Sequence, residues 1–158
     1  MRAGLARRIV LLFHSPASRR LISDEVAVRG AVTAIRNLLL PPGKRRPSSL
    51  TPGTRTYGRL SIQAAVSLLP AVVGDSRVAI LDESPISART RDVSLGGIGL
   101  VHSRRFPGRH AIVVFSAATP IWLVVGLIRS CPEGDDAWLS ATRILGLIQS
   151  GEAPTGIL

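Results

Sequence analysis

The chain has 158 residues, of which 46% are hydrophobic, and its twenty basic and ten acidic side chains give a formal net charge of +10. This length and composition fit one folded domain with an appendage and exclude a mainly disordered chain. The longest apolar runs fall well short of the ~20 residues of a membrane-spanning helix, and the single cysteine excludes an internal disulfide and a metal site built on cysteines.

The N-terminal segment, MRAGLARRIVLLFHSPASRR, combines early arginines with a short apolar centre. It differs from a secretory signal because arginines close the apolar centre in place of a small-residue cleavage site, so we expect a cytoplasmic protein. Positive charge is concentrated in residues 1–54, which have a balance of +8, against +2 for residues 55–158. Only Lys44 among the basic residues is a lysine, and an arginine-rich composition alone is weak evidence for nucleic-acid binding.

A helix is predicted between Leu21 and Leu40, where apolar residues recur at the spacing of one helical face: Val28, Val32, Ile35 and Leu39. Ser23 is the predicted N-cap, and the acidic residues after it suit the positive end of the helix dipole. The following stretch, PPGKRRPSSLTPGT, stops the helix and has the composition of a linker. Residues 1–54 are therefore predicted to form a basic helical extension with a Pro/Gly/Ser-rich linker.

Beyond Arg55 the apolar spacing changes to two, beginning with the segment RLSIQAAVSLLP, and this alternation predicts a half-buried strand. Six more strands are predicted between turn signals: Arg77–Leu81, Ile86–Val93, Ile98–Val101, Ala111–Ser116, Ile121–Arg129 and Trp138–Ile148. Short strands at this spacing predict an antiparallel barrel or sandwich over residues 55–150. Residues 151–158 are predicted to be a flexible tail.

Polar residues and a glycine pair interrupt one predicted strand, in the sequence RDVSLGGIGLV at residues 91–101. Asp92, Ser94 and Gly97 have the spacing D-x-S-x-x-G, and the pair Arg55 and Arg59 lies just before the first strand. Glycine weakens a strand interior and marks a bend or a close backbone approach. Two interpretations are open: these residues face a ligand, or the acid and the hydroxyl simply cap a tight turn at a strand end.

An R-x-x-x-R motif before the first strand, followed by [D/N]-x-S-x-x-G in a later strand, resembles the PilZ domain, a family that binds the bacterial second messenger cyclic di-GMP. The resemblance covers roughly residues 55–148 and implies a mainly β fold, a small antiparallel six-stranded barrel, here with an N-terminal helical extension. Since the last strand is followed only by QSGEAPTGIL, the N-terminal helix is a candidate to plug the barrel. The resemblance implies ligand binding by Arg55, Arg59, Asp92, Ser94 and Gly97, with Arg91 and Gly96 as auxiliary residues.

The chemistry of these residue types fits that ligand, which has two phosphates and two guanine bases. Arginine matches phosphate bidentately and also the O6/N7 edge of guanine. Asp92 can accept from guanine N1–H and N2–H, Ser94 can donate to a phosphate or base oxygen, and Gly96 and Gly97 let the backbone approach the ligand. Arg91 is predicted to alternate onto the strand face opposite Asp92, with an auxiliary phosphate contact as its second interpretation.

Three other functions compete with this hypothesis. A small basic barrel could bind nucleic acid through the N-terminal arm, but aromatic residues are only 4% of the chain, and single-strand-binding barrels rely on aromatic platforms. An enzyme is disfavoured because the sequence has no G-x-S-x-G, P-loop or dinucleotide motif. An adaptor that kept the fold and lost the ligand is disfavoured by the two intact motifs. We therefore predict a cyclic di-GMP receptor without a metal, in which the ligand reorients the N-terminal segment toward an unidentified protein partner.

Overall fold

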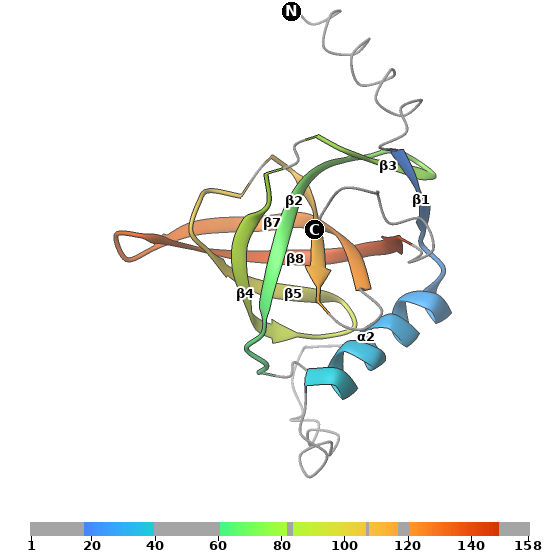
Figure 1. Cartoon of the computed structure of the whole chain (residues 1–158), viewed down its shortest axis with the longest axis horizontal. Coiled ribbons are helices and arrows are strands. Elements are labelled where there is room, and N and C mark those ends of the chain that lie inside the picture. The colour runs from blue at the N-terminus through green and yellow to red at the C-terminus, as the bar shows by residue number, and fades with distance from the viewer. Residues whose placement is uncertain (1–17, 40–60, 82–83, 107, 117–120, 149–158) are drawn as a thin grey trace, which may run out of the picture.

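The computed structural model describes residues 18–39, 61–81, 84–106, 108–116 and 121–148 (Figure 1). In chain order the elements are β1 (Ser18–Ile22), α2 (Glu25–Leu39), β2 (Ala65–Val73), β3 (Arg77–Ile80), β4 (Ile86–Val93), β5 (Gly97–His102), β6 (His110–Phe115), β7 (Ile121–Glu133) and β8 (Ala137–Ile148). All of the strand pairings in this part of the chain are antiparallel. The prediction of a mainly β, antiparallel fold is confirmed.

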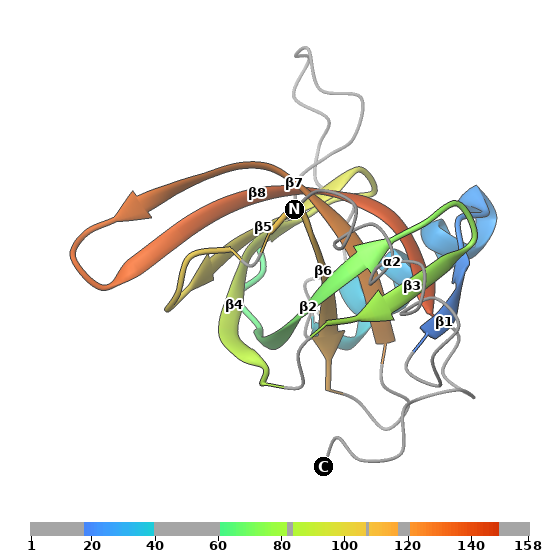
Figure 2. The same cartoon turned by 90° about the horizontal axis from the view of Figure 1, so that it is seen from above.

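Six strands close a ring of pairings in the order β2–β4–β5–β8–β7–β6 and back to β2. The other two strands lie beside this ring, since β3 pairs with β2 and with β1, and β1 also pairs with β8. The long hairpin of β7 and β8 projects beyond its neighbours, as the two views show (Figures 1 and 2).

Two predicted strands differ from the observed ones for reasons of packing. β2 begins at Ala65, later than predicted, and its adjacent residues Leu68 and Leu69 are both buried. Leu68 belongs to the larger core cluster and Leu69 to a second one, so the strand passes between two cores and departs from a period of two. β7 continues through the predicted turn to Glu133, and the chain reverses at Gly134, whose φ of 69° favours glycine.

The start of the described chain corrects the sequence interpretation. Residues 18–22 form β1, whereas the sequence pattern predicts Leu21 and Ile22 to belong to the helical segment. The helix begins at Glu25, and the backbone N–H of Ala27 donates to Oδ2 of Asp24 at 3.1 Å. The N-cap is therefore Asp24 and not Ser23.

The apolar face of α2 packs against the larger core cluster, as the spacing predicted. Val32 and Ile35 are 0% exposed and belong to the same cluster as residues of the six-strand ring, and Val28 and Leu39 are partly buried against it. Figure 1 shows α2 beside one end of the ring. The helix is thus part of the core, in agreement with the idea that it covers the end of the ring. In the described ranges, no helix is long and apolar enough to span a membrane.

Candidate functional site

An irregularity in β4 determines which motif side chains face outward. Thr90 and Asp92 pair with adjacent residues of β5, so Arg91 is an extra residue in a β-bulge. Thr90 and Val93 are both fully buried, whereas between them Arg91 is exposed and Asp92 half-buried. The prediction that Arg91 lies on the opposite face from Asp92 is therefore wrong. The bulge places both side chains on the outer surface, next to each other.

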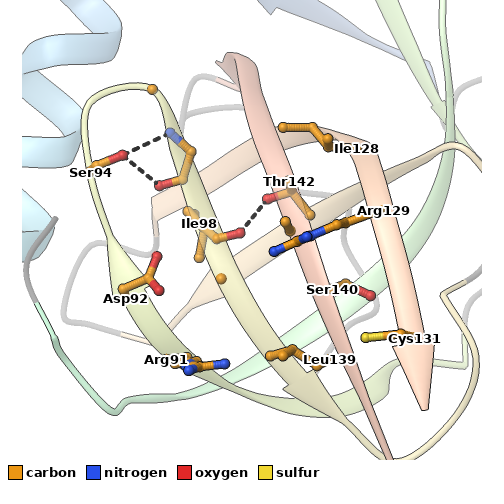
Figure 3. Close-up of a pocket in the computed structure, with 14 residues that line it drawn as sticks. Arg91, Asp92, Ser94, Ile98, Ile128, Arg129, Cys131, Leu139, Ser140 and Thr142 are labelled. Atoms are coloured by element: carbon orange, nitrogen blue, oxygen red, sulfur yellow. Dashed lines mark hydrogen bonds between the residues drawn. The ribbon is translucent and has the colours of Figure 1, made fainter. Parts of the chain in front are cut away.

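A groove of about 480 Å³ lies across β4, β5, β8 and β7 at this point (Figure 3). β4, the turn after it and the first residue of β5 contribute the described predicted site residues: Arg91, Asp92, Ser94, Gly96 and Gly97. β5 contributes Ile98 and Gly99, and the projecting hairpin contributes residues from both of its strands. The structure thus brings together every predicted site residue that it describes. The two predicted arginines, Arg55 and Arg59, lie outside the described residues.

The Asp92 carboxylate lies over Gly99 of the neighbouring strand. A Cβ atom at Gly99 would be 2.9 Å from Oδ2 and 3.1 Å from Oδ1 of Asp92, so only glycine leaves room for the carboxylate here. Among the described residues, the Asp92 carboxylate has no hydrogen-bond or ion-pair partner. Both carboxylate oxygens are therefore available to accept hydrogen bonds from a ligand in the groove.

The Ser94 hydroxyl is used in the turn that follows β4. Gly97 N–H donates to Ser94 Oγ at 3.1 Å, Ser94 Oγ donates to the Gly97 carbonyl at 3.2 Å, and Ser94 N–H donates to the same carbonyl at 2.9 Å. Figure 3 shows the two side-chain contacts as dashed lines. This geometry fits the turn-capping interpretation of the motif. A direct contact between Ser94 and a ligand stays a prediction.

The space at Gly97 is occupied by the neighbouring strand. A Cβ atom at Gly97 would come within 2.1 Å of the Thr142 carbonyl oxygen of β8. The same junction is fixed by a 2.8 Å hydrogen bond from Thr142 Oγ1 to the Ile98 carbonyl and a 3.0 Å bond from Ile144 N–H to the Gly96 carbonyl. Close packing of β5 on β8, rather than room for a ligand, therefore explains why residue 97 is a glycine.

The opposite side of the groove contains residues that the sequence motifs do not mark. In β7, Leu127 pairs with Thr142 and Arg129 pairs with Ala141, which leaves Ile128 as an extra residue in a second irregularity. Ile128 is 67% exposed, and Arg129 is exposed beside it. Both line the groove. The sequence signal for this side of the groove is Arg129, which follows the apolar run IWLVVGLI. By itself this pattern indicates only the end of a strand.

A buried polar contact lies next to the groove, where Ser140 joins β8 to β5. His102 Nε2 is 2.7 Å from Ser140 Oγ, which is 2.8 Å from Ser130 Oγ, and His102 Nδ1 contacts the Arg104 carbonyl. Burial lowers the pKa of His102, although the hydrogen bond to the Arg104 carbonyl acts in the opposite direction. Since Ser140 is only 1% exposed, its hydroxyl is enclosed and stabilises the strand junction.

Two further findings concern metal ligands and similarity to known proteins. Among the residues that the structure describes, no three His, Cys, Asp or Glu side chains gather in a way that could hold a metal ion. Comparison of the chain with family models, with curated proteins and with solved structures finds no match.

Proposed function

We propose that the groove binds cyclic di-GMP and that the protein is a PilZ-like receptor for this messenger. The observation that carries the proposal is the Asp92 carboxylate, which has no partner among the described residues and is held over Gly99 in a groove of about 480 Å³. Sites for small molecules have volumes of roughly 300–1,000 Å³ and contain a few convergent polar groups. Of the two sequence motifs that suggested the messenger, the one formed by Asp92, Ser94 and Gly97 lines this groove.

The groove offers chemistry for both parts of a guanine nucleotide. The Asp92 carboxylate can accept from the N1–H and N2–H groups of one guanine, in a charge-assisted pair of hydrogen bonds. Arg91, brought to the same face by the bulge, offers a guanidinium to a phosphate or to the O6/N7 edge of the base. In this proposal Arg55 and Arg59 contribute from the segment before β2, as the resemblance to the family implies.

The lining of the groove favours a nucleotide messenger over single-stranded nucleic acid. None of the residues that line the described groove is aromatic. Proteins that bind single strands without sequence preference gain roughly 1–3 kcal/mol per base from stacking on aromatic side chains. The groove instead combines one acid with arginines, a set suited to reading a guanine edge and a phosphate together.

Calorimetric titration with cyclic di-GMP tests this proposal, with GTP as the control ligand. Asp92→Ala is expected to weaken binding about 10- to 100-fold, because a hydrogen bond to a charged group contributes roughly 1.5–3 kcal/mol. Asp92→Asn keeps one accepting oxygen and should bind with intermediate affinity. Asp75→Ala removes an exposed acid from the turn between β2 and β3 and serves as the matched control. Folded wild-type protein that does not bind, or an Asp92→Ala variant that binds normally, overturns the proposal.

We also propose that the ligand changes the position of the N-terminal segment. Leu95, in the turn between β4 and β5 (residues 94–96, the motif turn), and Val28, in the first half of α2, line the same small pocket of about 200 Å³. The motif turn and the first half of the helix therefore both line one small pocket and are close in space. A ligand can shift α2 only by its differential affinity for two arrangements, and exposing Val32 and Ile35 would cost about 1.5–3 kcal/mol for each side chain.

Hydrogen exchange with and without cyclic di-GMP measures this second part of the proposal. Protection of amides in residues 24–60 is expected to change when the ligand binds, with β6 amides as an internal reference far from the motif turn. Saturating ligand that leaves the exchange of residues 24–60 unchanged would show that the messenger binds without moving this segment.

A further inference from the structure

We infer that the β7–β8 hairpin forms the second wall of the ligand site, with Arg129 binding a phosphate group across the groove from Asp92. This inference rests on the proposed function. It adds a residue that belongs to neither sequence motif and assigns a role to the part of the groove that the motifs leave unexplained.

Strand register places the two charged residues at opposite ends of one row. Asp92 pairs with Gly99, Gly99 pairs with Ala141, and Ala141 pairs with Arg129. The row crosses four neighbouring strands, which places its end Cα atoms on the order of 14 Å apart at ordinary strand spacing. Figure 3 shows the Arg129 side chain extending from β7 over β8 toward β5, and the Asp92 carboxylate turned toward β5 from the other side. The two head groups thus approach the middle of the groove from opposite walls.

The two residues between Asp92 and Arg129 in this row have small side chains or none, so the floor of the groove is low there. Gly99 has no side chain, and the carboxylate of Asp92 occupies the position next to it. Ala141 carries only a methyl group and is half-buried in the groove lining. A planar base can therefore lie over Ala141, with its edge against the Asp92 carboxylate above Gly99 and its phosphate toward Arg129. Larger side chains at position 141 would fill this space.

The charge of Arg129 is available for such a contact. Arg129 is exposed and lines the groove, and its guanidinium has no ion-pair or hydrogen-bond partner within the described ranges. The irregularity at Ile128 sets the face of β7 on which the Arg129 side chain lies, just as the bulge at Arg91 sets the face of β4 on which Asp92 lies. A guanidinium matches a phosphate bidentately, with a geometry that lysine does not reproduce.

Titration of charge variants with cyclic di-GMP tests the role of Arg129. Arg129→Ala is expected to bind roughly 10- to 100-fold more weakly than the wild type, and Arg129→Lys to recover only part of this loss. Arg20→Ala is the matched control, because Arg20 is an exposed arginine of β1 that does not line the groove, and it should bind within about twofold of the wild type. A similar loss in both alanine variants would reduce the effect to net charge and overturn the inference.

A steric variant tests the floor without changing charge. Ala141→Leu is expected to abolish binding, whereas Ala141→Ser should retain it. Thermal unfolding checks that each variant is folded, and because Arg129 is exposed, its variants decide the question even if Ala141→Leu does not fold. Normal binding by Arg129→Ala, with binding still lost in Asp92→Ala, overturns this inference and leaves the proposed function standing. Absence of binding by the wild type overturns both.

Discussion

The carboxylate of Asp92 lies where a side chain of Gly99 would begin, with Oδ2 only 2.9 Å from the position of that Cβ atom. The two residues are paired across β4 and β5, and Gly99 is not one of the spaced motif positions. The glycine-rich sequence LGGIGL therefore contains two different kinds of glycine. Gly97 makes room for the backbone of β8, and Gly99 makes room for the acid of the motif.

Gly99→Ala is expected to weaken binding of cyclic di-GMP about tenfold or more while the fold persists. The added methyl group meets only the far end of the Asp92 side chain, which can rotate away from the groove. Titration gives the affinity, and thermal unfolding gives the stability. Gly30→Ala is the matched control, because a methyl group on α2 would meet nothing within 4 Å, and we expect it to raise stability by about 0.5–1 kcal/mol without affecting binding. Unchanged affinity in Gly99→Ala would contradict the position given to Asp92.

Gly97→Ala is expected to destabilise the protein by about 1–3 kcal/mol or more. The new Cβ atom would overlap the Thr142 carbonyl oxygen at 2.1 Å, and because this neighbour is backbone, β5 and β8 must move apart. Urea unfolding measures the free energy of unfolding for this variant and for the wild type. Equal stability of the two would show that the junction between β5 and β8 is looser than the structure has it.

Ile35→Ala is expected to lower the free energy of unfolding by about 2–5 kcal/mol, the usual cost of removing a fully buried aliphatic side chain. Leu38→Ala, on the same helix but 51% exposed, should change it by no more than about 0.5 kcal/mol. Urea unfolding of both variants compares them directly. Equal, small effects would mean that α2 is an appendage and not part of the core.

His102 is expected to make stability fall as the pH is lowered through 6.5. Burial lowers the pKa of His102 below 6.5, so between the folded pKa and 6.5 the unfolded chain binds more protons than the folded chain. The stabilisation is complete above pH 6.5 and is lost toward the folded pKa. The free energy of unfolding, measured at about pH 7.5 and about pH 5.5, should therefore fall less in His102→Gln than in the wild type.

His110 needs its own variant in the same measurement. Its pKa is also lowered, by burial first and then by the positive charges of Arg109 and Arg143, so it contributes in the same direction. His110→Gln separates the two contributions. A wild type and a His102→Gln variant that lose the same stability between the two pH values would show that His102 stays accessible to protons in the folded protein.

Local patterns in the sequence were enough to predict most of the elements. Burial alternates in β4 up to the bulge and throughout β5, and the i, i+3, i+4 spacing of α2 marks the face that carries Val32 and Ile35. These patterns are legible because the direction of a side chain relative to its own helix or strand depends on backbone geometry alone. The motif spacing likewise indicated which residues of β4 and its turn would lie together.

Other features depended on partners far away in the chain. β1 is short and has no pattern of its own, and it forms because β3 and β8 offer it pairing edges. The bulge at Arg91 exists only in the register of β4 against β5, and it brings Asp92 to the same outer face as Arg91. Arg129 reaches the groove through the register of β7, β8 and β5. Register between strands is a non-local property, so the sequence by itself determined the strands and the motif, and only the tertiary structure decided which residues face one another across the groove.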